Sequence, residues 1–208
     1  MLLIDHLTIK KRIPILTGFS FTFEKGHLYG IVAVNGSGKT TFFRAIMGLT
    51  PIDSGSFSIQ EVQDKSDFLI NKHCFYFESN EWFDLNLSGL DYLTFIKKQW
   101  HSSKEISDII TLWQMEDYIR LPIKKYSLGM KQKLLISLYL VSDANYLLMD
   151  EITNGLDEES RKILYTTLSQ LKQQGKTIIL SSHYKEDIEE FCDYLLLLKN
   201  QTMEVSKL

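Results

Sequence analysis

The chain has 208 residues, of which 44% are hydrophobic and 24% charged, values that are ordinary for a globular domain with a substantial core. Its net charge of −3 provides no positive field to attract nucleic acid, so we expect no nucleic-acid partner. Its longest apolar runs, such as residues 138–141, are far shorter than the roughly 18–20 residues of a membrane-spanning helix.

The first predicted elements are strands. Phe19, Phe21 and Phe23 alternate with polar residues, a period of two that is typical of a half-buried antiparallel strand. Residues 28–34 are nearly all apolar, which predicts a strand covered on both faces. A glycine-rich loop follows, and then a helix that begins at Lys39 and that Gly48 can end.

This loop has the composition of a phosphate-binding loop. Its glycines let successive backbone N–H groups converge on phosphate oxygens, and the positive end of the following helix adds to the attraction. We expect Lys39 to reach the β and γ phosphates of a nucleotide, and the Thr40 hydroxyl to ligate Mg²⁺. The predicted nucleotide-binding residues are Asn35, Gly36, Ser37, Gly38, Lys39, Thr40 and Thr41.

The middle of the chain is predicted to be helical. Ser102 and Glu105 have the spacing of a capping box that begins one helix. The apolar face of that helix is expected to contain Ile106, Ile109, Ile110 and Trp113. An earlier helix is expected to carry Tyr92, Leu93, Ile96 and Trp100.

Two short apolar strands are predicted at residues 145–149 and 176–180, with a helix at residues 158–174 between them. A strand, helix and strand in this order predict a parallel sheet, so the fold class is α/β and the middle helices are an insertion into its core. Cys74 and Cys192 are far apart and have no CxxC partner, which favours two free thiols over a zinc site or a disulfide.

Two carboxylates follow the first of these strands. Asp150 is suited to hold Mg²⁺, and Glu151 is suited to act as the general base for an attacking water. Residues 153–157, Thr-Asn-Gly-Leu-Asp, come directly afterwards, and residues 126–132, Tyr-Ser-Leu-Gly-Met-Lys-Gln, lie upstream.

With these motifs the sequence resembles the ATPase subunits of ABC transporters over essentially its whole length. The family order is P-loop, Q-loop, signature, Walker B, D-loop and H-loop, and each motif has a counterpart here in that order. The resemblance implies a P-loop NTPase with a RecA-like parallel sheet, an N-terminal antiparallel β subdomain and an inserted α-helical subdomain at about residues 85–142. All three would form one ABC ATPase domain at residues 1–208.

The resemblance also implies roles for single residues. The signature corresponds to Ser127, Leu128, Gly129 and Met130, with Leu for one family glycine and Met for the glutamine, ahead of a helix at residues 131–142. It is expected to act in trans, on ATP held by a second subunit. Asp157 is the D-loop aspartate and His183 the H-loop histidine, which makes the expected catalytic residues Lys39, Glu151 and His183.

Three positions depart from the family pattern. Ala33 replaces the first P-loop glycine, a change that costs little if its φ stays negative. Glu78 stands in place of the Q-loop glutamine, and as a carboxylate it can hold metal but donates no amide hydrogen bond, so the expected metal residues are Thr40, Glu78 and Asp150. Residues 7–15 contain no aromatic ring to stack on adenine, and only Lys10, Lys11 and Arg12 offer a cation for its face.

The resemblance further implies ATP and Mg²⁺ as cofactors and a second ATPase subunit, in a homodimer or a heterodimer. An integral membrane permease is expected to dock near Glu78, Trp82 and Phe83, which places the subunit peripherally at the cytoplasmic face of the cell membrane. The two rings line a groove for a permease helix or, alternatively, belong to the core of the helical subdomain.

The signature wording looks most similar to subunits that export, or give immunity to, antibiotic peptides such as bacitracin and lantibiotics. We therefore expect export of a peptide or drug-like substrate, which the permease selects. The alternative is a soluble ABC-type ATPase that is not attached to a permease.

Overall fold

The large β-sheet forms the centre of the molecule. In the computed structural model, which describes residues 1–60, 70–182 and 185–208, six strands pair in the order β5-β6-β7-β3-β8-β9. All neighbours are parallel except β8 and β9, which form an antiparallel hairpin. The bounds are β3 Leu28–Val32, β5 Cys74–Tyr76, β6 Tyr146–Met149, β7 Thr177–Ser181, β8 Tyr194–Lys199 and β9 Thr202–Lys207. The predicted parallel α/β core is confirmed.

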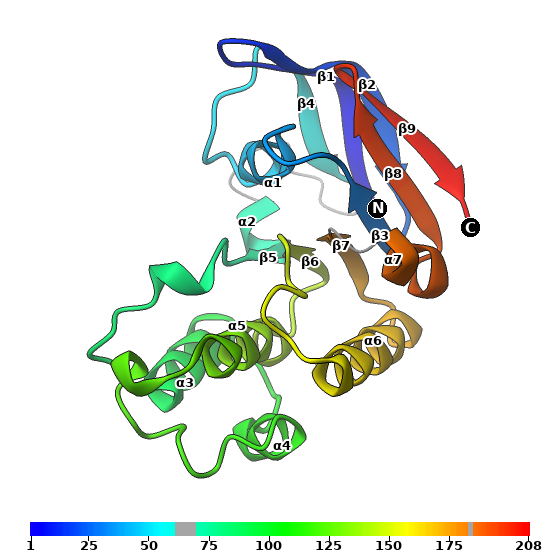
Figure 1. The fold of residues 1–208 in the computed structure, drawn as a ribbon. Coiled ribbons are helices and arrows are strands. Elements are labelled where there is room, and N and C mark those ends of the chain that lie inside the picture. Colours follow the sequence, from blue (N-terminus) through cyan, green and yellow to red (C-terminus); the bar gives the residue numbers. More distant parts are fainter. Residues whose placement is uncertain (61–69, 183–184) are drawn as a thin grey trace.

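A second, antiparallel sheet is formed by β1 (Leu2–Lys10), β2 (Pro14–Phe23) and β4 (Ser54–Ile59), in the order β2-β1-β4. Phe19 and Phe23 of β2 are buried and Phe21 is half-buried, so the predicted alternating strand is confirmed. Figure 1 shows this sheet beside α1 (Lys39–Ile46), in the part of the molecule away from the helices α3 to α6.

Most of the helices, among them α3 to α6, pack on the face of the large sheet opposite to α1 and the small sheet (Figure 1). Their bounds are α2 Ile70–His73, α3 Gly89–Gln99, α4 Ile106–Leu112, α5 Leu128–Ser142, α6 Glu158–Gln173 and α7 Lys185–Phe191. Two short 3-10 helices, η2 (Asn80–Trp82) and η3 (Ile123–Lys125), lie before and after α3 and α4. None of the helices in the described ranges is both long and apolar enough to cross a membrane.

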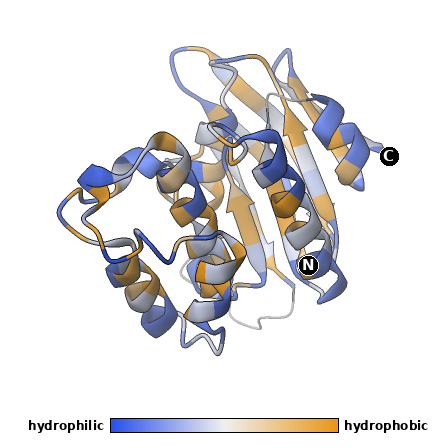
Figure 2. Ribbon diagram, turned by 60° about the horizontal axis from the view of Figure 1, so that its bottom comes forward, coloured by the Kyte–Doolittle hydropathy of each residue, from blue (hydrophilic) through white to orange (hydrophobic). Residues whose placement is uncertain are grey.

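Two hydrophobic cores lie on the two faces of the large sheet. Tyr146 and Leu148 of β6 pack in the core that contains α1 and the small sheet, whereas Leu147 and Met149 pack in the core that contains α3 to α6. This division follows from the period of two along a strand. Figure 2 shows the strands coloured mainly as hydrophobic and the helices as a mixture.

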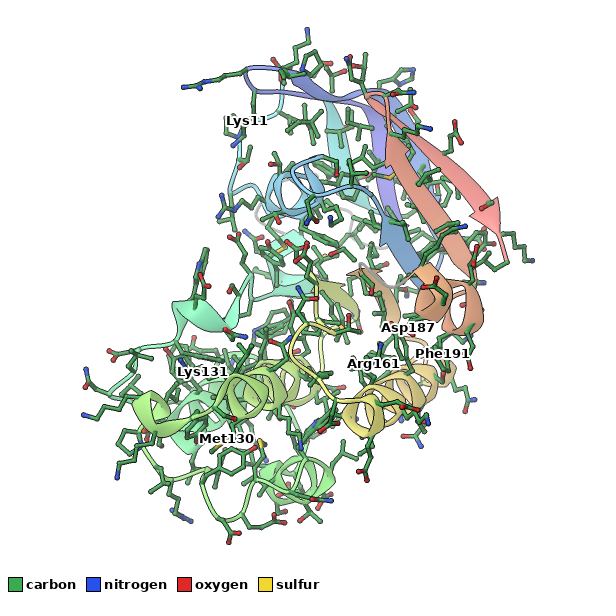
Figure 3. All side chains as sticks on the ribbon, viewed as in Figure 1. Lys11, Met130, Lys131, Arg161, Asp187 and Phe191 are labelled. Atoms are coloured by element: carbon green, nitrogen blue, oxygen red, sulfur yellow. The ribbon has the colours of Figure 1, made fainter. Side chains whose placement is uncertain are left out.

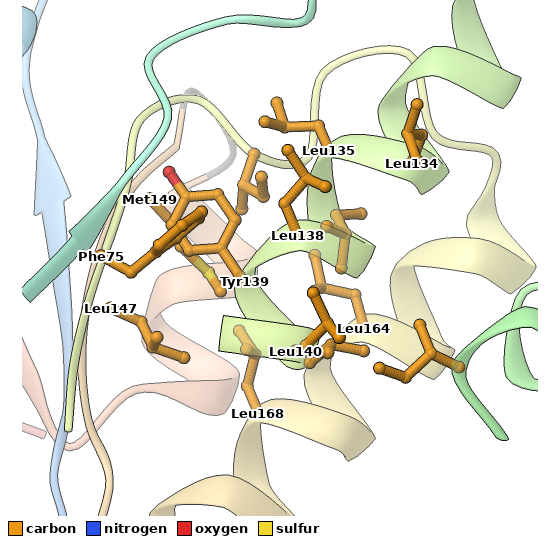
Figure 4. Close-up of a cluster of buried hydrophobic side chains, with 14 of the residues drawn as sticks. Phe75, Leu134, Leu135, Leu138, Tyr139, Leu140, Leu147, Met149, Leu164 and Leu168 are labelled. Atoms are coloured by element: carbon orange, nitrogen blue, oxygen red, sulfur yellow. The ribbon is translucent and has the colours of Figure 1, made fainter. Parts of the chain in front are cut away.

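Helix α5 is the most deeply buried helix, and its apolar side chains fill the helical core. Leu134, Leu138 and Tyr139 are essentially inaccessible, and the ring of Tyr139 meets that of Phe75 edge-on at 5.0 Å (Figure 4). The helix begins at Leu128, three residues before the predicted start, because Ser127 caps it by accepting a hydrogen bond from the Met130 backbone N–H.

The predicted capping box at Ser102 and Glu105 is wrong. The helix begins at Ile106, and Ser102 instead accepts from the Lys104 backbone N–H in a turn before it. A reciprocal capping box is found at the start of α3, where Ser88 accepts from Asp91 N–H and the Asp91 carboxylate accepts from Ser88 N–H. Ser88 and Ser102 each precede an acidic residue by three positions, so this spacing alone does not show which serine caps a helix.

The two cysteines are buried free thiols, as predicted. Burial raises the pKa of both Cys74 and Cys192 to about 12. The predicted strand at residues 28–34 is shorter than expected, since β3 ends at Val32 and the chain then enters the glycine-rich loop.

The two capping arrangements give a direct test. Ser88→Ala removes a side-chain acceptor from the first turn of α3 and is expected to lower the free energy of unfolding by about 1 kcal/mol. Ser102→Ala is the matched control, with an expected change below about 0.5 kcal/mol because it caps no helix. Urea unfolding of both variants measures the difference, and equal losses would contradict the assignment of the cap.

Candidate functional site

The predicted nucleotide-binding loop connects β3 to α1 at the carboxyl edge of the parallel sheet, where ligands commonly bind in such folds. Gly36 and Gly38 both have positive φ, at 75° and 109°. A Cβ at Gly38 would lie 2.3 Å from Cγ2 of Ile15, so this position has no room for a side chain. Ala33 is not among the residues with positive φ, which meets the condition under which its methyl group is tolerated.

Lys39 is the first residue of α1, and its side chain is buried. Its Nζ lies 3.5 Å from the Glu151 carboxylate and donates to the Ala33 carbonyl at 3.2 Å. A buried ammonium with these two oxygens close by is placed to contact phosphate oxygens in the same loop. The structure therefore brings together Lys39 and Glu151, which are far apart in the sequence.

Asp150 follows β6 and is only 8% exposed. Its carboxylate accepts from the Thr40 hydroxyl at 2.5 Å and from the Ser181 hydroxyl at 2.6 Å. Burial raises the pKa of Asp150, while these two hydrogen bonds act in the opposite direction. A partly desolvated carboxylate beside a hydroxyl supplies the hard oxygen ligands that Mg²⁺ prefers.

This arrangement fits a metal that takes its other ligands from phosphate and water. Across the described ranges there is no cluster of three or more His, Cys, Asp and Glu side chains that would hold a metal by themselves. When bound, Mg²⁺ would neutralise part of the phosphate charge.

Glu151 has a left-handed backbone, with φ 47°. Its backbone N–H donates to the Ser181 hydroxyl at 2.8 Å, and its carboxylate accepts from the Asn154 side-chain amide at 2.9 Å. The carboxylate is thus held between Asn154 and Lys39. Sequence reasoning did not identify Asn154 or Ser181 as partners, since only the structure brings the end of β7 to this turn.

One cavity of about 350 Å³ contains the predicted metal and base residues together. Thr40, Glu78, Asp150 and Glu151 line it, along with Ser79, Asn80, Glu81, Leu128, Gln132, Leu135 and Asn154. Glu78 faces the cavity, but its carboxylate is bound by the Arg44 guanidinium through both oxygens. Gln132 is buried and links two segments of the cavity wall, donating to the Ile152 carbonyl and accepting from the Asn80 amide.

The signature residues lie on the first turn of α5 (Ser127, Leu128, Gly129 and Met130). Leu128 alone of the four lines this cavity, and it is an exposed apolar side chain. Figure 3 labels Met130 and Lys131 in the helical part of the molecule, near α5.

Asp157 caps the start of α6, where its carboxylate accepts from the Ser160 backbone N–H at 2.7 Å, and this hydrogen bond lowers the pKa of Asp157. One turn later, Arg161 forms an ion pair with Asp187 of α7 at 3.4 Å (Figure 3). The predicted switch histidine, His183, lies outside the described residues.

Of the two aromatic residues that follow Glu78, Trp82 lies at the surface and Phe83 lies in the core. Trp82 is 55% exposed, whereas Phe83 is 4% exposed and packs against Phe77 and Tyr92 with ring centroids 5.2 and 4.9 Å apart. The expectation that both rings line an exposed groove is therefore wrong for Phe83, because its ring fills the space between α3 and the segment after β5.

A second cavity, of about 550 Å³, adjoins the glycine-rich loop on the side of the β1–β2 turn. Its lining residues are Lys11, Arg12, Ile13, Pro14, Ile15, Gly36, Ser37, Gly38 and Thr41, and none of them is aromatic. Because this cavity adjoins the loop that would hold the phosphates, it is a candidate site for the base of the nucleotide. Its apolar wall is formed by Ile13 and Ile15.

The chain is similar in sequence to known ATP-binding proteins of transporters. The sequence profile of the family described as "ABC transporter" matches residues 16–154. The chain is 36% identical over 212 residues to the uncharacterized ABC transporter ATP-binding protein YybJ of Bacillus subtilis (strain 168), covering 100% of this chain and 96% of that protein. It is 26% identical over 219 residues to the Nod factor export ATP-binding protein I of Burkholderia lata, covering 94% and 67% respectively.

The fold is also found among solved structures. One described as the structure of the ATP binding subunit of an ABC transporter superposes with a TM-score of 0.90 at 21% identity, over 100% of this chain and 90% of that chain.

The second cavity predicts weak selection of the base. A ring would supply roughly 1–3 kcal/mol by stacking on either base and would hold its plane in place for recognition of its edge. Without a ring we expect GTP to compete with ATP within about tenfold, or about 1.4 kcal/mol. Ile13→Tyr puts a ring on this wall and is expected to tighten ATP binding, whereas Ile13→Leu is the control. Displacement of a fluorescent ATP analogue measures both, and a preference for ATP above about a hundredfold in the unmodified chain would refute the prediction.

Proposed function

The chain belongs to the ABC transporter family of ATP-binding proteins, whose members hydrolyse ATP, and we propose that this subunit powers export through a separate membrane permease. The observation that carries the ATPase assignment is the single cavity in which Thr40, Asp150 and Glu151 meet beside the buried Lys39. Export is supported by the similarity to the Nod factor export protein.

In the proposed reaction, the N–H groups and side chains of residues 35–41 bind the triphosphate, with Lys39 at the β and γ phosphates. Thr40 and Asp150 would hold Mg²⁺, and Glu78 borders the same cavity with both oxygens bound by Arg44. Once Lys39 turns from Glu151 to the phosphates, the carboxylate of Glu151 is available to orient the attacking water. We propose that His183 contacts the γ-phosphate.

A second copy or a homologous subunit would complete the site. Ser127, Leu128, Gly129 and Met130 begin α5, and Leu128 is exposed there. The positive end of this helix would stabilise the γ-phosphate of the opposite subunit, a role that arginine fingers have in other P-loop enzymes. Asp157, at the start of α6, would lie at the same dimer interface.

We further propose that residues 1–208 form one ATPase domain, with the helical subdomain at about residues 85–142, and that it works peripherally at the cytoplasmic face of the membrane. Trp82, Leu85 and Leu87 are exposed apolar side chains on the segment after β5, which supports docking of a permease helix there. The proposed cargo is a peptide or drug-like molecule. The second candidate, a soluble ATPase without a permease, leaves this apolar surface without a role.

Hydrolysis should depend on Lys39 and Glu151 for different reasons. Lys39→Ala is expected to abolish ATP binding because the phosphates lose their buried cation. Glu151→Gln is expected to keep ATP binding but to lower kcat by about 10²–10⁴-fold, the range for a lost general base, and to accumulate as an ATP-bound dimer in size-exclusion chromatography. Glu159→Gln and Lys207→Ala are exposed controls. Near-normal turnover in Glu151→Gln would remove Glu151 from the mechanism.

Trp82 and Phe83 should respond oppositely to truncation. Phe83→Ala empties a buried ring site and is expected to cost about 3–5 kcal/mol of folding free energy. Trp82→Ala is expected to leave the melting temperature and the basal ATPase almost unchanged, but to lose co-purification with the permease, since such anchors commonly contribute 2 kcal/mol or more to binding. Thermal melts and membrane pull-downs measure this, and full retention of the permease by Trp82→Ala would eliminate Trp82 as an anchor.

A further inference from the structure

The Arg44–Glu78 ion pair is a feature of the site to which the proposed reaction gives no role. Arg44 Nε donates to Glu78 Oε2 at 2.5 Å, and its Nη2 donates to Oε1, so the guanidinium binds both carboxylate oxygens. The Tyr76 hydroxyl donates to Oε2 at 3.1 Å. The Glu78 side chain is only 10% exposed, and a carboxylate so removed from water needs a charged partner with this geometry.

The fold places this pair directly beside the Thr40–Asp150 pair. Strands β5 and β6 are parallel with Tyr76 opposite Leu148, and Glu78 and Asp150 each stand two residues further along. Thr40 and Arg44 are one turn apart on α1, so their side chains leave the same face of the helix. One face of α1 therefore holds two neighbouring strand ends, through Thr40 to Asp150 and through Arg44 to Glu78.

Four carboxylates line the cavity, and Glu81 is the exposed one among them. Two of the other three are paired with a cation. Lys39 pairs with Glu151, and Arg44 pairs with Glu78. Within the part of the chain that the structure describes, no lysine or arginine forms an ion pair with Asp150, which is bound by the hydroxyls of Thr40 and Ser181. Among these three less exposed carboxylates, the one without an ion pair is thus Asp150, beside the Thr40 hydroxyl.

We propose that Arg44 is a positioning residue that neutralises Glu78 and keeps its carboxylate from the metal, so that Asp150 is the carboxylate presented to Mg²⁺. This inference rests on the proposed function, because it requires a magnesium–nucleotide complex in the cavity. It replaces the sequence-based expectation that Glu78 is itself a metal ligand. Because the charges of Glu78 and Arg44 are opposite, the ion pair adds no net charge to the wall of the cavity.

Removal of Arg44 has a defined electrostatic consequence. The Glu78 carboxylate would then add one negative charge to the wall of the cavity, which attracts Mg²⁺ and repels metal-free ATP. A unit charge a few ångströms from a charged ligand in a partly buried site changes affinity by about tenfold or more. The ratio of the Kd for ATP in EDTA to the Kd for ATP in excess Mg²⁺ reports this charge without any measurement of turnover.

The experiment compares this Kd ratio for the full chain and three variants, with a fluorescent ATP analogue as the probe. Arg44→Met is expected to raise the ratio about tenfold. The double variant Arg44→Met, Glu78→Gln is expected to return it to within about threefold of the unmodified chain, because both charges are gone. Glu78→Gln alone leaves an unpaired cation and is expected to lower the ratio about tenfold. Lys207→Met, an exposed cation in β9, is the control and should leave the ratio unchanged.

If the Arg44–Glu78 ion pair only stabilises the fold, the melting temperatures of the variants fall and the Kd ratio stays the same in all of them. That result would overturn the inference while leaving the proposed ATPase intact. If Arg44→Met does not fold, the near-isosteric Glu78→Gln tests the inference instead. An unchanged Kd ratio in Glu78→Gln would also overturn it. A chain that binds no ATP in either condition would overturn the proposed function and this inference together.

Discussion

Burial of the Asp150 carboxylate at the end of β6 is the constraint on which the site depends. A carboxylate removed from water destabilises the fold by several kcal/mol unless its oxygens are satisfied. Here the oxygens bind the hydroxyls of Thr40 and Ser181, which come from α1 and from the end of β7. The same serine accepts from the Glu151 backbone N–H, so one cluster fixes the phosphate-loop helix, the two strand ends and the turn of the proposed base.

Helix α1 is held to the sheet from two sides. Thr40 and Arg44 bind the ends of β6 and β5 through polar contacts. Phe42 and Phe43 are fully buried in the core shared with the small antiparallel sheet. A helix with both kinds of attachment has little freedom to rotate, and its first turn therefore holds Lys39 and the phosphate loop in one orientation.

A buried amide on α5 links the helical half of the molecule to this site. Gln132 of α5 donates to the carbonyl of Ile152, which follows Glu151 directly, and accepts from Asn80 on the segment that leads to the exposed Trp82. Since the amide is buried, loss of either contact would leave a polar group without a partner. Gln132, on the signature helix, thus connects the segment of the proposed docking surface to the turn of the proposed base.

The sequence by itself determined the features that depend on short-range physics. Alternation in β2 and continuous apolar runs in β3, β6 and β7 predicted a parallel core with an antiparallel sheet at the N-terminus, because burial on one or two faces selects those patterns. The positive φ of Gly36 and Gly38 was likewise encoded locally. The tertiary structure alone decided that Ser88 and not Ser102 caps a helix, and that Phe83 is buried beside an exposed Trp82. It also decided that Glu78 faces Arg44. These outcomes depend on which strand ends and helices become neighbours, and a pattern that spans a few residues contains no information about partners brought together from distant parts of the chain.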